Sequence, residues 1–231
     1  MRSITFTGWL VQSFELANKR PVLWLGSVLF LAVFLALGRV SLALAILFSV
    51  SSLFIGVAIV DYIHREDGSV WKTIQKHLPL AVSLAVLVLI FWFAFRVVAN
   101  IYSAETEKIA QFFFHWELTA ENLHSMVFRE LIVWLYSSAI VALIFILLML
   151  NSFGSWFSFP LMAFKQKSWS EARELGKQAT AENLAAMYKL TGFLLITAFI
   201  GLGLIPLLTP LFYMLVATLM YVSYHDIFVK K

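Results

Sequence analysis

The chain of 231 residues is 61% hydrophobic and 13% charged, with a mean hydropathy of +0.88. Soluble domains carry about 25% charged residues, so this composition excludes a soluble fold. The absence of cysteine excludes disulfides and thiolate metal sites. The net charge of +4 is no nucleic-acid signal, because the basic residues lie beside apolar segments.

Continuous apolar runs, without the alternation of barrel strands, predict an all-α membrane protein of one domain. Residues 8–20 form an amphipathic helix in the interface, with Leu10, Phe14 and Ala17 on one face. An uncleaved first span at 21–38 and a second at 40–60 follow, joined by a tight hairpin at Gly38 and Arg39.

Residues 69–77 read as a short helix capped by Ser69, followed by a third span at 79–98. Two amphipathic segments, 105–116 and 121–134, come next. The uncharged stretch 131–164 would be about 50 Å long as one helix, against an apolar bilayer core of about 30 Å. We place the fourth span at 138–164, with a bend near 151–155 and Pro160.

The spacing of Ser168 and Glu171 predicts a capping box that opens a charged helix running to Gln178. The fifth and sixth spans, 190–205 and 206–224, meet at a turn between Gly201 and Pro206. A re-entrant hairpin over 190–224 is the alternative.

The basic residues predict the orientation. With six spans, 13 of the 17 Lys and Arg residues fall on the side of both termini, which is therefore cytoplasmic. A weak internal repeat supports this order. Shifting residues 43–69 by 99 positions aligns a span, a small polar cluster and a cytoplasmic helix in each half, although identities are near chance.

No ionisable residue lies at the centre of a predicted span, which argues against a proton relay or voltage sensor. Two polar clusters could line a path between spans two and four, but close helix packing is the favoured interpretation. The clusters contain Ser49, Ser51, Ser52, Asn151, Ser152 and Ser155.

A divalent metal could be held in the outer loop, where four imidazole and carboxylate side chains lie close in sequence. A solvated acidic surface is the favoured reading of these residues, which are His115, Glu117, Glu121 and His124. The aromatic run 112–116 is read as an interfacial anchor, with a docking patch for a partner as the alternative. Asp61 with His64, and His225 with Asp226, suggest ion pairs at span ends.

Basic and aromatic residues of the two cytoplasmic helices are expected to contact anionic lipid headgroups. They are Lys72, Lys76, Lys165, Lys167, Arg173, Lys177, Trp71 and Trp169. The competing interpretation is that these helices recruit a soluble partner, which Glu171 and Glu174 favour.

Three sequence features carry a family resemblance: Trp9…Phe14…Asn18-Lys-Arg-Pro21, Gly68-Ser69, and the segment 167–173. Their order resembles small bacterial inner-membrane proteins, namely the YciC-like proteins and the membrane domain of some glycerophosphodiester phosphodiesterases. The resemblance implies a multi-pass protein of a bacterial cytoplasmic membrane. No phosphodiesterase domain is present, so no catalytic residue carries over.

No nucleophile–base motif or Gly-rich phosphate loop occurs in the chain. We therefore expect a non-enzymatic accessory, assembly or lipid-organising protein without a cofactor. Its partners would be membrane lipids and another membrane protein. The alternative is a transporter or channel for a lipid-like or neutral solute through the Ser/Asn path.

Overall fold

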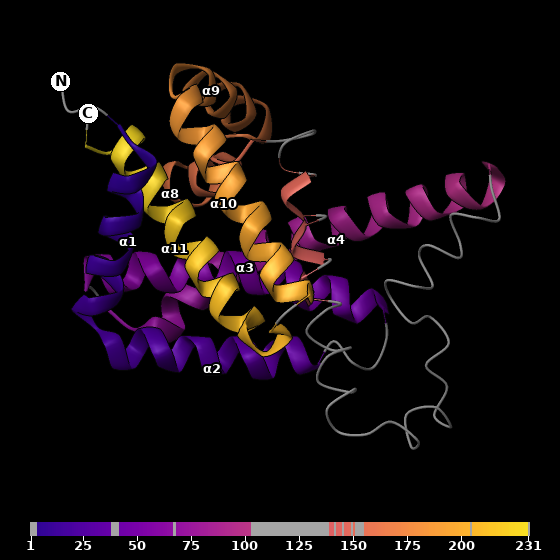
Figure 1. Cartoon of the computed structure of the whole chain (residues 1–231), viewed down its shortest axis with the longest axis horizontal. Coiled ribbons are helices and arrows are strands. Elements are labelled where there is room, and N and C mark those ends of the chain that lie inside the picture. The colour runs from indigo at the N-terminus through magenta and orange to yellow at the C-terminus, as the bar shows by residue number, and fades with distance from the viewer. Residues whose placement is uncertain are drawn as a thin grey trace.

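The computed structural model describes residues 4–37, 42–66, 68–102, 139–140, 142–144, 146–148, 150, 155–203 and 205–230. These parts of the chain are helical and contain no strand, which confirms the all-α prediction. The elements are α1 (Phe6–Lys19), α2 (Pro21–Leu37), α3 (Leu42–Arg65), α4 (Val70–Tyr102), α8 (Ser158–Lys165), α9 (Trp169–Glu182), α10 (Leu184–Gly203), the 3₁₀ turn η2 (Pro206–Leu208) and α11 (Thr209–Phe228) (Figure 1).

Four helices of the described part are long and apolar enough to cross a membrane. Their spanning segments are Ala43–Arg65, Val70–Ala94, Leu184–Gly201 and Thr209–Phe228. Helices α1 and α2 bend by 99° at their junction and would add a fifth span if the pair is counted as one. These helices show a membrane protein. The prediction of six spans stays open, because much of the predicted fourth span lies outside the described residues.

Two predicted boundaries differ from the structure. The predicted short helix at 69–77 and the predicted third span form one helix, α4, of 33 residues with Pro79 inside it. Proline removes one backbone donor and often ends a helix, which is why the sequence suggested a boundary there. The charged residues before Pro79 are therefore the first turns of a spanning helix, whereas we had expected a separate surface helix.

The last part of the predicted fourth span is helix α8, which begins at Ser158 after a turn at Trp156 and Phe157. Residues 190–224 form α10, η2 and α11, and α10 and α11 each have 20 residues. Both pass the length and apolarity criteria for a span, which favours two crossings over a shallow re-entrant hairpin.

Helix α11 is the central element of the described bundle. Its side chains are buried along almost its whole length, and α1, α2, α3 and α8 pack around it. Three tryptophans on three different segments donate their indole N–H groups to α11. Trp9 Nε1 lies 3.1 Å from Asp226, Trp24 Nε1 3.2 Å from Thr218, and Trp156 Nε1 2.9 Å from Ser223.

Helices α3 and α11 approach closely at a glycine. A Cβ atom placed on Gly56 would lie 2.9 Å from the Cβ of Ala217, which is closer than packed carbon atoms allow. Small residues at helix interfaces permit this kind of contact in membranes, where association depends on close packing.

Replacing Gly56 by valine should therefore push α3 away from α11 and lower the free energy of unfolding by about 1–3 kcal/mol. Gly26 on α2 is the control, because nothing lies within 4 Å of a Cβ placed there. Thermal unfolding in detergent should show a lower Tm for Gly56→Val and a smaller change for Gly26→Val. Equal Tm values for the two variants would contradict this packing.

Candidate functional site at the charged end

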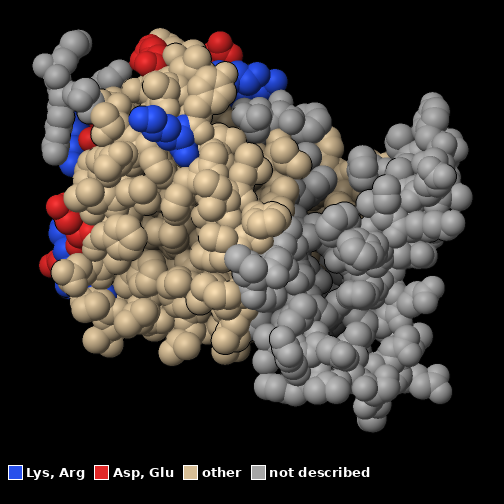
Figure 2. Space-filling model, viewed as in Figure 1, with Lys and Arg blue, Asp and Glu red and all other residues tan. Residues whose placement is uncertain are grey.

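Charged side chains of the described residues gather at one end of the bundle, here called the charged end. Figure 2 shows Lys, Arg, Asp and Glu along the upper and left edges of the described part, while most of the remaining surface on this face is uncharged. Three contacts join α1, α3, α8 and α11 there. Arg20 pairs with Glu66 at 3.6 Å, Lys165 Nζ donates to the Phe228 carbonyl at 2.7 Å, and Lys230 Nζ donates to Gln12 at 3.1 Å.

Asp61 is the buried carboxylate of this end, and its partner is Arg65. The Arg65 Nε atom lies 2.7 Å from Asp61 Oδ1 across one helical turn. The sequence suggested an ion pair between Asp61 and His64, but the partner of Asp61 in the structure is Arg65. His64 has another contact. Its ring packs against His225, with 4.6 Å between the centroids.

No group of three or more His, Asp or Glu side chains in the described ranges could hold a metal ion. The sequence suggested an ion pair between Asp226 and His225. In the structure, the Asp226 carboxylate accepts a hydrogen bond from the indole N–H of Trp9. The low-priority metal candidates His115, Glu117, Glu121 and His124 lie outside the described residues, as does the aromatic run 112–116.

The predicted serine clusters are placed only in part, because Asn151 and Ser152 are outside the described residues. Ser49, Ser51 and Ser52 are buried on α3. The hydroxyls of Ser51 and Ser52 have no hydrogen-bond partner among the described residues. Ser155 is buried elsewhere, with its hydroxyl 3.0 Å from that of Ser158.

Ser155 packs against α9 at Gly176. A Cβ atom on Gly176 would lie 1.8 Å from Ser155 Oγ, so only glycine fits without movement of the serine. This contact gives Ser155 a packing role. The small residues Ala172, Gly176 and Ala179 form the buried strip of α9, at spacings of four and three residues.

The N-terminus of α9 has the predicted capping box. Ser168 Oγ accepts from the Glu171 backbone N–H at 3.4 Å, and the Ser168 N–H donates to Glu171 Oε2 at 3.1 Å. The backbone N–H and hydroxyl of Ser168, together with nearby Lys167, lower the pKa of Glu171. Glu171 is thus ionised when the helix is capped, and the helix runs on to Glu182, beyond the predicted end at Gln178.

The predicted lipid-contact residues have different surroundings. Trp71 is 61% exposed on the first turn of α4, and Lys72 and Lys76 are exposed beside it. Trp169 is half-buried against the core. Lys165 bonds the end of α11, Lys167 lies 3.9 Å from Glu171, and Arg173 and Lys177 are exposed.

An apolar cavity of about 260 Å³ lies beside α9, between α3 and α4. Its walls include Phe54, Leu84, Val88 and Leu150, and α9 contributes Trp169 and Arg173. Among the described residues of this lining, Arg173 is the only charged one. The cavity therefore combines a hydrocarbon interior with one cationic group.

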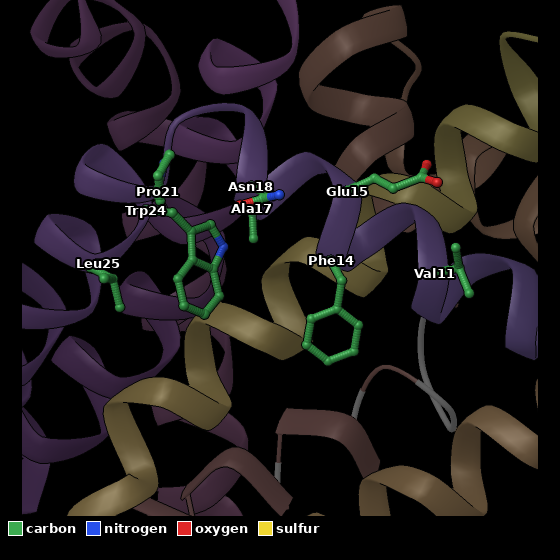
Figure 3. Close-up of a pocket in the computed structure, with 8 residues that line it drawn as sticks. All are labelled: Val11, Phe14, Glu15, Ala17, Asn18, Pro21, Trp24 and Leu25. Atoms are coloured by element: carbon green, nitrogen blue, oxygen red, sulfur yellow. The ribbon is translucent and has the colours of Figure 1, made fainter.

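A second, mostly apolar hollow of about 530 Å³ lies in the angle between α1 and α2. Figure 3 shows Phe14 of α1 and Trp24 of α2 directed into the angle, with Val11 and Leu25 further out along the two helices. Phe14 is 64% exposed and Leu25 56% exposed. An amphipathic helix that meets a span at a steep angle, with apolar side chains facing outward beneath it, is typical of an interfacial helix.

Comparisons with known proteins give no relative: no protein-family model, characterised protein or solved structure matches the chain. The resemblance to YciC-like proteins therefore stays a prediction.

Sequence reasoning found the α9 cap and the basic residues near it, because both are local patterns. It missed the cavity and the pairing of His64 with His225, which depend on how helices distant in sequence pack. It also missed the three indole bonds to α11. Trp24 and Thr218 are 194 residues apart, and no local signal connects them.

Proposed function

We propose that the protein is a non-enzymatic component of a bacterial inner membrane that organises anionic lipid, or assists another membrane protein, at its charged end. The observation that carries the proposal is the set of exposed basic side chains on α4 and α9, beside spanning helices. Lys72, Lys76, Arg173 and Lys177 have no ion-pair partner among the described residues. Basic groups near an anionic leaflet contribute about 1 kcal/mol each to membrane binding.

The hollow between α1 and α2 supports the same proposal. Its walls are mostly apolar, with Glu15 and Asn18 as the polar residues of its described lining, and the helix above it lies across the start of a span, so acyl chains of the surrounding leaflet would fill its apolar part. The absence of catalytic motifs from the sequence favours a role without chemistry.

We also propose an orientation in the membrane, in which the charged end and both termini lie in the cytoplasm. The native chain has no cysteine, so single cysteines report it directly. Ser69→Cys and Ser170→Cys, both at exposed positions, should resist a membrane-impermeant maleimide in intact cells and react after permeabilisation. Thr106→Cys, in the loop that the sequence places outside, is the opposite control. Labelling of Ser69→Cys or Ser170→Cys in intact cells would reverse the proposed orientation.

Lipid binding is tested by thermal unfolding in nanodiscs made of phosphatidylcholine with and without phosphatidylglycerol. A ligand that binds the folded state raises Tm, so phosphatidylglycerol should raise the Tm of the wild-type protein. Neutralising Lys72, Lys76, Arg173 and Lys177 to glutamine should remove more than half of that rise, since these groups supply the attraction.

Lys165 stays unchanged in that variant, because it bonds the end of α11 and its loss would alter folding. Comparing the two proteins in phosphatidylcholine alone separates any general loss of stability from lost lipid binding. A wild-type Tm that does not respond to phosphatidylglycerol would refute the lipid-binding proposal.

Transport of a lipid-like or neutral solute is the second candidate function. The buried hydroxyls of Ser51 and Ser52, which have no partner among the described residues, are the observation that favours it. The cavities beside α9 and between α1 and α2 are not lined by these serines, so lipid organisation is the better supported function.

A further inference from the structure

We propose that one anionic phospholipid binds at a defined site beside α9, with part of an acyl chain in the 260 Å³ cavity and its phosphate at Arg173. This inference rests on the proposed function, and it adds a specific site to a general attraction between a charged surface and the leaflet.

The interior of the cavity fits hydrocarbon. Phe54, Leu84 and Val88 form buried walls, and Phe54 is held in place by ring stacking on Phe159 at 4.3 Å. Pockets that enclose a whole small molecule have volumes of about 300–1,000 Å³. The smaller volume here fits a segment of an acyl chain, with the rest of the lipid outside.

The cavity has a side that faces the apolar surface of the protein. Leu87 belongs to its lining and is 37% exposed, and the neighbouring turn of α4 presents Ile90 and Phe93 outward. In a membrane-spanning helix, such a face contacts acyl chains. A chain can therefore enter the cavity from the bilayer without crossing a polar surface.

Arg173 supplies the recognition of the headgroup. Its guanidinium forms no ion pair with a carboxylate of the described residues, and the nearby Glu171 is bonded to Ser168 and paired with Lys167. Arginine presents a planar set of donors that match two phosphate oxygens at once. Trp169, one turn earlier on the same helix, also lines the cavity, and tryptophan prefers the boundary between headgroups and chains.

These features select an amphiphile with a negative headgroup. A soluble anion would leave the apolar walls without a partner, and an apolar molecule would leave Arg173 without one. A zwitterionic lipid shares the phosphate, but its ammonium group adds a positive charge near Arg173 and Lys177. We therefore expect phosphatidylglycerol to bind more tightly than phosphatidylcholine.

The test uses the full-length protein, purified, stripped of lipid and titrated with phosphatidylglycerol while native mass spectrometry counts bound lipids. Arg173→Gln should weaken the first binding event at least about fivefold, as expected for losing about 1 kcal/mol. Lys189→Gln is the matched control, since Lys189 is an exposed basic residue on α10, is not part of the cavity lining and does not belong to the proposed lipid-binding set.

The chain-binding part is tested by filling the cavity. Val88→Phe adds volume at a buried wall and should also weaken the first event at least about fivefold, while Ile90→Phe, 59% exposed on the same helix, should leave it unchanged. Tm measured without lipid identifies any variant that fails to fold. If Val88→Phe fails to fold, Leu87→Trp replaces it, because Leu87 is partly exposed at the cavity edge.

Loss of the first binding event in Arg173→Gln and in the cavity variant, with both controls intact, supports the site. Equal weakening by Arg173→Gln and Lys189→Gln, with no effect of the cavity variant, overturns it while leaving the general attraction of the proposed function intact. No preference for phosphatidylglycerol over phosphatidylcholine in the wild-type protein overturns both.

Discussion

Hydrogen bonds from three indole groups to α11 are the interactions on which the rest of the described bundle depends. Between helices surrounded by lipid there is little hydrophobic driving force, so packing and interhelical hydrogen bonds select the arrangement. Trp9, Trp24 and Trp156 arrive on α1, on α2 and on the turn before α8, and each finds an oxygen on α11. In a fourth hydrogen bond α11 is the donor: the Tyr213 hydroxyl lies 2.7 Å from the carbonyl oxygen of Ala139.

The same arrangement positions the proposed functional surface. The turn containing Trp156 is fixed to Ser223 of α11, and Ser155 next to it packs against Gly176 of α9. Through this connection α9 is held beside the α3–α4 pair, where Arg173 and Trp169 meet the apolar cavity. The indole bonds thus link the packing of the bundle to the position of Arg173, the one cationic group among the described residues of that lining.

Much of the fold was predictable because membrane helices carry long, local signals. The runs that became α3, α10 and α11, the break between α1 and α2, and the cap at Ser168 are all visible in short windows of sequence. Boundaries near prolines were less predictable, since Pro79 is accommodated inside α4. The roles of the clustered serines were not predictable from the sequence. Ser155 contacts the hydroxyl of Ser158 and packs against Gly176, whereas the hydroxyls of Ser51 and Ser52 have no hydrogen-bond partner among the described residues. This difference depends on the tertiary arrangement of the helices.

Thermal unfolding of two serine variants tests the role of α11 most directly. Ser223 and Ser52 are both completely buried, but Ser223 accepts the Trp156 indole while Ser52 bonds no described residue. Ser223→Ala should leave a buried indole N–H unpaired and lower the free energy of unfolding by about 1–2 kcal/mol. Ser52→Ala should leave it unchanged or raise it, because it removes a buried hydroxyl without a partner. An equal loss in both variants, or a loss only in Ser52→Ala, would contradict the account.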